Sequence, residues 1–276
     1  MFGPGVYMLS WLRISAVALL FSAVLVLPLQ AQNSEQVEVG PPPLHRADPP
    51  APGASPEELE RRGDQLREDK NYLDAVDYYQ AALKGSPNNA SLFNKIGMCQ
   101  LQTHRDKEAK RSFERAIKVD HNHADAYSNL GVTYYDMQKH NAAIRQYEKA
   151  IALKNDAGSY YSNLGAAYFA KKQFEKAIQC YAKAVELDPD IFERSSRAGV
   201  QARLASPEDR AHYDYVLAKM YAKTGAHDRS LHYLKKAMEE GYKDIKNVYK
   251  DNEFSTLRKD PRFAELMAAK TTAIPD

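Results

Sequence analysis

The chain has 276 residues, with 38 Lys and Arg against 36 Asp and Glu, so its formal net charge is only +2. A protein that binds phosphate backbones is expected to show a basic face and an isoelectric point above the value of about 8.3 found here. The charge balance therefore gives no indication of nucleic-acid binding. The length by itself allows one or two ordinary domains.

The N-terminal 31 residues carry the features of a signal peptide. Arg13 precedes Ile14–Leu29, a mostly apolar run of sixteen residues, and Ala31 supplies a small residue before a cleavage point. We therefore expect residues 1–31 to direct export from the cytoplasm, to a periplasmic or secreted location. The run is shorter than the roughly 20 residues of a spanning helix. An uncleaved leader is the alternative, in which residues 8–29 would anchor the chain to a membrane.

Residues 32–55 are rich in proline and poor in apolar side chains. Six prolines fall in this stretch: Pro41, Pro42, Pro43, Pro49, Pro50 and Pro52. Such a composition predicts an extended, disordered linker. A helix is then expected to begin at Pro56, because Ser55 is a suitable N-cap and glutamates follow in the first turn.

Residues 56–191 repeat with a period of 34. Four units of this length follow one another: 56–89, 90–123, 124–157 and 158–191. Units three and four match best, with these pairs one period apart: Tyr127 and Tyr161, Leu130 and Leu164, Gly131 and Gly165, Tyr134 and Tyr168, Ala143 and Ala177, Tyr147 and Tyr181, and Ala150 and Ala184. A fixed period of this size indicates a stack of similar structural units.

Each unit has the pattern of two amphipathic helices. Large apolar residues at unit positions 4, 7 and 11, and again at 20, 24, 27 and 28, recur at helical spacing. Small residues such as Gly131 and Ala143 allow two helix axes to approach within about 8 Å. Because neither helix pair can bury its apolar stripe alone, successive units are expected to stack.

These residues resemble the tetratricopeptide repeat, in which a large apolar residue, Leu-Gly, Tyr, Ala, an aromatic residue, Ala and Pro stand at fixed offsets. The resemblance covers residues 56–191, with local departures at Arg62, Gln100, His121 and Asn155. It implies an all-α fold: an α-α solenoid of helix-turn-helix units stacked in a right-handed superhelix. It also implies a concave groove, lined by the first helix of each unit, that holds an extended segment of a partner protein.

Beyond Pro189 the period breaks. We expect an insertion at 192–210 and then a degenerate fifth unit at 211–244. Residues 245–276 are predicted to form a C-terminal cap, with a helix that opens at Asp260-Pro261. Solenoids need such caps because their last unit would otherwise expose an apolar face.

No enzyme motif is recognisable, and no cofactor is expected. The sequence contains no phosphate-binding loop, dinucleotide fingerprint, metalloprotease motif or nucleophile elbow. His121 and His123 form the most metal-like cluster, but we interpret them as a solvated turn and predict no metal site. Cys99 and Cys180 lie two units apart and should stay unpaired, because helices spaced about 8–10 Å apart lie between them.

A helix turns about 100° per residue, which places positions 2, 5, 6, 9 and 13 of each first helix opposite the buried stripe. In the tetratricopeptide repeat this side lines the groove. The candidate peptide-binding residues are therefore Asn94, Lys95, Met98 and Gln102 in unit two, Asn129 and Val132 in unit three, Asn163 and Ala166 in unit four, and Lys219 in unit five. Asn129 and Asn163 resemble rungs of an asparagine ladder, because carboxamides can bond successive peptide groups. The alternative is that these two residues merely tolerate exposure.

The two ends of the groove differ in charge. Unit one presents Glu60 and Asp64, and unit five presents Lys219. This predicts that an extended ligand lies with its basic part toward unit one and its acidic part toward unit five, unless these are ordinary solvated faces. Glu60 and Asp64 stand where the family's chaperone-tail binders need Lys and Asn, so that mode of binding is not expected.

Tyr135 and Phe169 occupy position 12 on the flank of the groove. Each is expected to pack against the following unit rather than to line a ligand pocket.

Two functions are consistent with the sequence. The first is a non-enzymatic scaffold, exported from the cytoplasm, that holds an extended peptide segment of a partner protein in its groove. The second is a structural assembly subunit of a cell-envelope complex, acting through its convex face or its C-terminal cap.

Overall fold

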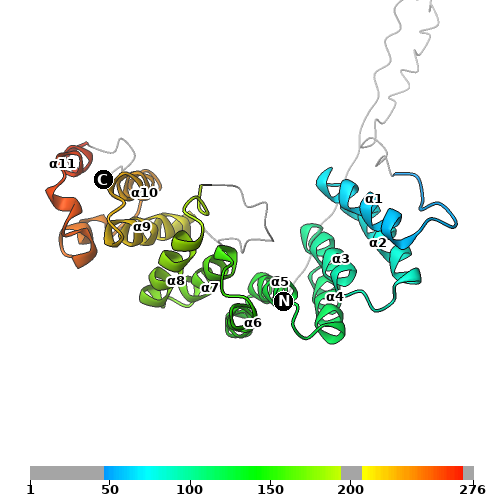
Figure 1. Cartoon of the computed structure of the whole chain (residues 1–276). Coiled ribbons are helices and arrows are strands. Elements are labelled where there is room, and N and C mark those ends of the chain that lie inside the picture. Colours follow the sequence, from blue (N-terminus) through cyan, green and yellow to red (C-terminus); the bar gives the residue numbers. More distant parts are fainter. Residues whose placement is uncertain (1–46, 194–206, 270–276) are drawn as a thin grey trace, which may run out of the picture. The chain divides into compact units, whose positions relative to one another are not determined.

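The structure is a computed structural model that describes residues 47–193 and 207–269. These ranges contain eleven α-helices, three short 3₁₀ helices and no strand. Four helix pairs fill the four predicted units: α1 (Pro56–Glu68) with α2 (Tyr72–Gly85), α3 (Ala90–Gln102) with α4 (Asp106–Val119), α5 (Ala124–Asp136) with α6 (His140–Leu153), and α7 (Gly158–Ala170) with α8 (Phe174–Leu187). The helices of each pair pack against each other (Figure 1). The predicted all-α architecture of stacked helix pairs is confirmed.

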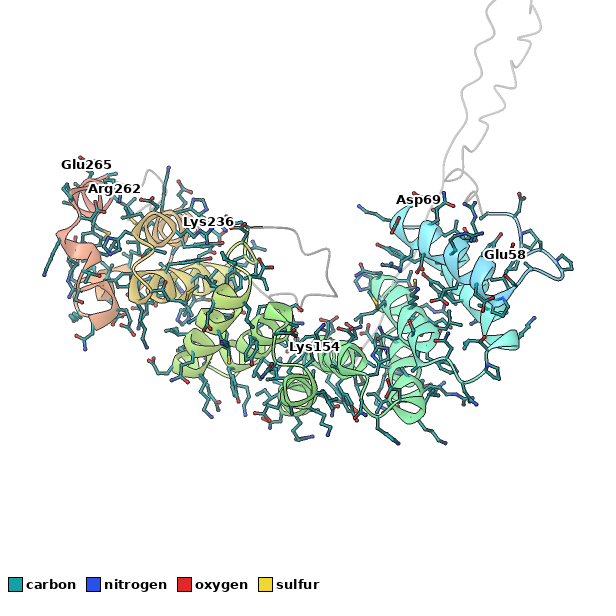
Figure 2. All side chains as sticks on the ribbon, viewed as in Figure 1. Glu58, Asp69, Lys154, Lys236, Arg262 and Glu265 are labelled. Atoms are coloured by element: carbon teal, nitrogen blue, oxygen red, sulfur yellow. The ribbon has the colours of Figure 1, made fainter. Side chains whose placement is uncertain are left out.

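Several sequence predictions fall outside the described residues. These are the leader at 1–31, the first part of the linker and most of the insertion. Among the helices that are described, none combines the length and the apolar character needed to cross a membrane. Charged side chains such as Glu58, Lys154 and Glu265 are exposed (Figure 2).

The start of α1 is the predicted one. Ser55 Oγ accepts a hydrogen bond from the Glu58 backbone N–H, and the Glu58 carboxylate accepts one from the Ser55 backbone N–H. This reciprocal capping satisfies two backbone donors at the helix end. The hydrogen bonds also lower the pKa of the Glu58 carboxyl, the backbone bond to Ser55 most strongly.

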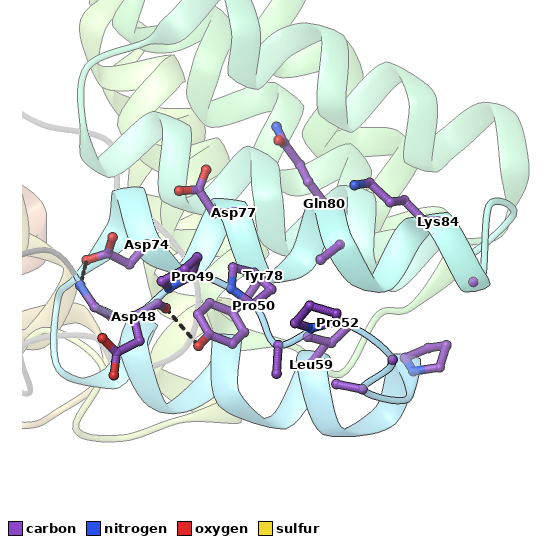
Figure 3. Close-up of a pocket in the computed structure, with 17 residues that line it drawn as sticks. Asp48, Pro49, Pro50, Pro52, Leu59, Asp74, Asp77, Tyr78, Gln80 and Lys84 are labelled. Atoms are coloured by element: carbon purple, nitrogen blue, oxygen red, sulfur yellow. Dashed lines mark hydrogen bonds between the residues drawn. The ribbon is translucent and has the colours of Figure 1, made fainter.

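Residues 47–54 correct the prediction of a disordered linker over this part of its length. They lie along α2 and leave a cavity of about 850 Å³ beside it (Figure 3). Tyr78 Oη donates a hydrogen bond to the Asp48 carbonyl at 2.9 Å, and the Ala47 backbone N–H donates to the Asp74 carboxylate at 3.2 Å. Proline has no N–H, so a proline-rich segment can lie on a helix with few donors left to satisfy.

The buried core residues recur with the 34-residue period of the sequence. Unit position 24 holds Tyr79, Phe113, Tyr147 and Tyr181, and none of these rings has exposed surface. Position 8 of the first helix faces this ring, and a Cβ added at Gly131 would lie 2.5 Å from a ring carbon of Tyr147. Glycine is therefore required at this position because the ring occupies the space of any side chain.

The turn inside each unit has a shared backbone conformation that residue types do not reveal. Lys70, His104, Gln138 and Lys172 lie one period apart, and each has φ between 57° and 62°. Gly225, with φ of 79°, occupies the corresponding turn of the fifth helix pair. The left-handed region ends a helix sharply and favours glycine. Four units thus tolerate a non-glycine residue in a conformation that the fifth unit gives to glycine.

The C-terminal part contains a fifth pair, α9 (Pro207–Lys223) with α10 (His227–Glu239). It continues through η1 (Ile245–Tyr249), η2 (Asn252–Phe254), η3 (Leu257–Lys259) and α11 (Pro261–Ala268). The tail buries Val248, Phe254, Leu257 and Phe263 in one core with α9 and α10. The helix predicted to open at Asp260-Pro261 is confirmed, and the Asp260 carboxylate accepts a hydrogen bond from the Arg262 backbone N–H.

Candidate functional site

The face of the first helices contains a seam of asparagines. Helix α5 contacts both α3 and α7, and Asn94, Asn129 and Asn163 lie along these contacts. Asn129 Nδ2 donates a hydrogen bond to Asn94 Oδ1 at 3.0 Å. The structure therefore joins one of the two predicted ladder residues, Asn129, to the candidate groove residue Asn94 of the preceding unit.

The seam is less accessible than the sequence implied. Asn94, Asn129 and Asn163 are only 5–8% exposed, Ala166 is 8% exposed, and Val132 has no exposed surface. Small residues at these positions let neighbouring first helices pack directly on each other. Val132 consequently belongs to the core rather than to a contact surface. Neither sequence interpretation of the asparagines foresaw this, because both placed them on exposed surface.

The edge of the face, at unit two, is more open. Lys95, Met98 and Gln102 are all partly exposed. Lys95 Nζ lies 2.7 Å from Glu60 Oε1 and 2.7 Å from Asp64 Oδ2. The lysine thus neutralises part of the acidic end of the groove, which weakens the basis for the predicted ligand orientation. Met98 and Gln102 are the predicted residues best placed to meet a partner.

At unit five the expectation of an open groove is wrong. Lys219 Nζ lies 3.2 Å from the Asp251 carboxylate and 3.4 Å from the Glu253 carboxylate, and its side chain is 15% exposed. Tyr215 Oη donates a hydrogen bond to Asp251 at 2.9 Å. The tail around η2 supplies these carboxylates, so it takes the place that an acidic partner segment was predicted to occupy. Periodicity cannot reveal this, because the tail is outside the repeat.

Tyr135 and Phe169 are buried, at 4% exposure each. The Phe169 ring lies 5.4 Å from that of His212 and 5.6 Å from that of Tyr213, measured between centroids. Phe169 therefore packs against the following pair, as predicted. Both aromatic residues also line a cavity of about 130 Å³ together with His140, Phe174 and His212. His140 and Phe174 were not predicted, although unit position 17 holds an aromatic ring in three of the four units, as Tyr72, His140 and Phe174.

His123 and the two cysteines have structural roles. His123 caps α5, with Nδ1 accepting a hydrogen bond from the Ala126 backbone N–H at 3.4 Å. Within residues 47–193 and 207–269, no group of three or more His, Cys, Asp or Glu could hold a metal ion. Cys99 and Cys180 are both unpaired, as predicted. Burial raises the pKa of Cys99 to about 12 and that of Cys180 to about 11, so both are protonated at neutral pH and weakly reactive.

Comparison with known families decides the class of the protein. Three family models, described as tetratricopeptide or TPR repeats, match residues 66–132, 133–172 and 159–191. The chain is a tetratricopeptide repeat protein. No curated protein sequence matches it.

Solved structures that resemble the chain include two of MamA and one of YrrB. A MamA crystal structure shares 23% identity, covering 71% of this chain and 95% of its own, with a TM-score of 0.47. MamA from Desulfovibrio magneticus RS-1 shares 18% identity, covering 71% and 97%, with a TM-score of 0.48. YrrB, described as a TPR protein with an unusual peptide-binding site, shares 18% identity, covering 66% and 84%, with a TM-score of 0.45.

One departure from the tetratricopeptide pattern has a clear local explanation. Gln100 in unit two stands where units three and four have Tyr134 and Tyr168. It is 7% exposed, and its Oε1 accepts a hydrogen bond from Ser112 Oγ at 2.7 Å. The hydrogen bond within the helix pair satisfies the buried carbonyl of the amide, which would otherwise cost stability.

Proposed function

We propose that this tetratricopeptide protein is a non-enzymatic scaffold that holds an extended segment of a partner protein on the face of its first helices. Tetratricopeptide proteins bind other proteins or peptides. The observation that carries the proposal is that α3, α5 and α7 contact one another in series and leave Lys95, Met98 and Gln102 partly exposed at the edge of their shared face. An extended segment can follow this edge, where the Gln102 carboxamide offers both a donor and an acceptor to its peptide groups.

The binding face is bounded at both ends by the chain itself. At unit one, Lys95 forms ion pairs with Glu60 and Asp64, so the negative charge there is already partly compensated within the chain. At unit five the η2 segment covers Lys219. The partner segment is therefore proposed to lie over units two to four, where Met98 and Gln102 form the accessible edge.

Photo-crosslinking tests this proposal. A photoreactive residue replaces Gln102 at the edge of the binding face, and a matched variant carries it at Arg145, an exposed residue of α6. Irradiation of the full-length protein in its native extract is expected to capture a defined protein through position 102 only. Identical products from both positions, or none from position 102, would refute binding at this face.

We also propose that the scaffold acts outside the cytoplasm. The support is in the sequence, where Arg13 precedes the apolar run Ile14–Leu29. Cell fractionation combined with N-terminal sequencing of the mature protein tests this. Cleavage after Ala31, or a full-length chain in the membrane fraction, would fit export or anchoring. A full-length chain in the cytosolic fraction would contradict both.

A structural assembly subunit is the second candidate function. An apolar hollow of about 400 Å³ lies over α6, α7 and α8, lined by Ile151, Ala152, Leu164 and Cys180 among others. Exposed apolar surface of this kind is typical of contact sites. Light scattering of the wild type and of the Ala152→Asp variant separates the two functions. An oligomer that dissociates in the variant supports assembly, whereas a wild-type monomer counts against it.

A further inference from the structure

We propose that the cavity lined by Tyr135, His140, Phe169, Phe174 and His212, here called the ring pocket, anchors one phenylalanine or tyrosine side chain of the bound segment. The inference rests on the proposed function, because it names the residue type by which the partner is held.

The ring pocket is built by three successive units. Tyr135 lies next to the last residue of α5, and His140 begins α6. Phe169 lies near the end of α7, and Phe174 begins α8. His212 comes from the first turns of α9. Ala170, at groove position 13, also lines the cavity. The pocket therefore adjoins the predicted groove, within reach of a segment that lies along it.

Five of the nine lining residues carry aromatic rings that pack on each other, and the other four are Gln138, Ala170, Lys172 and Asp209. The Phe174 and His212 ring centroids are 4.3 Å apart, and those of Phe169 and Phe174 are 5.5 Å apart. His140 packs on Tyr135 with centroids 5.1 Å apart. Tilted contacts near these distances are favourable between rings. Walls that already support one another lose little freedom when a ligand enters, which favours binding.

The volume selects the size of the occupant. The cavity measures about 130 Å³. A cavity of roughly 150 Å³ with apolar walls is known to accept a benzene ring. The pocket consequently matches one six-membered ring and is too small for the two fused rings of tryptophan.

The charges around the pocket disfavour a cationic occupant. Burial lowers the pKa of both His140 and His212, and Lys171 acts in the same direction on His140, so both imidazoles are neutral at neutral pH. Lys172 lines the cavity, where it would repel a lysine or arginine. The carboxylate of Asp209 also lines it, but already takes part in an interaction within the chain. A neutral ring fits these surroundings better than an ammonium group.

NMR titration of the isotope-labelled protein tests the pocket directly. The probes are the N-acetyl amides of phenylalanine and tyrosine, with those of leucine, lysine and tryptophan for comparison. The first two are expected to shift the imidazole resonances of His140 and His212 saturably, and the other three to bind at least about tenfold more weakly. Absence of a saturable shift, or equal binding of the lysine amide, would overturn the proposal.

A variant that fills the pocket supplies the control. Ala170→Leu places a larger side chain against the cavity and is expected to weaken binding of the phenylalanine amide by about tenfold or more. Ala152→Leu makes the same change in the hollow over α6 to α8 and should bind normally. If Ala170→Leu does not fold, Phe174→Leu removes one ring wall while keeping an apolar side chain. Normal binding by a folded pocket variant would contradict the assignment.

The NMR titration and the crosslinking experiment can succeed or fail independently of each other. Crosslinking through position 102 does not depend on any residue of the ring pocket. If crosslinking succeeds but the amides do not bind, the pocket assignment fails and the scaffold stands. If the amides bind but crosslinking fails, the cavity accepts an aromatic ring, but its role in holding a partner segment fails together with the groove proposal.

Discussion

Units one and two carry ion pairs in addition to a shared apolar core, whereas units three to five carry packed aromatic rings around one cavity. In the first region Lys95 pairs with Glu60 and Asp64, and Tyr79 Oη donates a hydrogen bond to Asp64 at 2.8 Å. In the second, Phe169 contacts Phe174, His212 and Tyr213. One repeat pattern thus supports two kinds of interface.

The difference is clearest at unit position 24. Tyr79 and Tyr147 occupy this position in units one and three, and both rings are fully buried. The hydroxyl of Tyr79 donates a hydrogen bond to Asp64, while that of Tyr147 has no hydrogen-bond partner among the residues that the structure describes. The repeat therefore requires a six-membered aromatic ring at position 24. Whether a hydroxyl on that ring forms a hydrogen bond depends on the neighbouring side chains of each unit.

The largest effect is expected where rings pack between units. Phe169→Ala should reduce the free energy of unfolding by about 3–5 kcal/mol, because it removes a buried ring that packs against the three rings of Phe174, His212 and Tyr213. Chemical denaturation measures this change. Phe169→Leu serves as a control that keeps most of the volume and should cost clearly less. A loss below about 1 kcal/mol for the alanine variant would show that ring packing does not hold this region together.

The close approach of helices within a unit gives the next effect. Gly131→Ala should destabilise the protein by about 1–3 kcal/mol, because the added Cβ would lie 2.5 Å from the Tyr147 ring. Thermal unfolding measures the loss. Adding Tyr147→Leu should recover part of it by removing the opposing ring carbons. Strict additivity of the two substitutions would mean that they do not meet in space.

A pair of tyrosine substitutions tests the comparison itself. Tyr79→Phe should cost about 1.5–3 kcal/mol, because it removes a hydrogen bond to a carboxylate. Tyr147→Phe should be neutral or slightly stabilising, because it removes a buried hydroxyl that bonds to none of the described residues. Denaturant unfolding of both variants is compared under the same conditions. Equal losses would remove the distinction between the two regions.

The smallest expected effect is a loss of stability at low pH, which arises from His140 and His212. Burial lowers the pKa of His140 and His212 in the folded protein. The unfolded chain, with an ordinary histidine pKa near about 6.5, therefore binds protons first as the pH falls. The free energy of unfolding therefore falls as the pH drops from about 6.5 toward the pKa values of His140 and His212 in the folded protein. His212→Phe should flatten this part of the stability curve, and an unchanged slope would show that His212 does not contribute.

The amino-acid sequence determined the repeated part of the fold. The period of 34 residues located every helix pair from α1 to α8, and Ser55 and Asp260-Pro261 marked two helix starts. Gly131 and Ala143 indicated a close approach of two helices. These features are readable because helical periodicity and capping are local, and repetition averages out exceptions.

Tertiary structure alone decided which groups on that fold are accessible. It buried Asn94, Asn129 and Asn163 between units, placed the η2 segment over Lys219, and laid residues 47–54 along α2. It also brought the rings of three units around one cavity. Exposure depends on how closely neighbouring helices approach and on where non-repeating segments pack, and neither quantity is encoded in the period of the repeat.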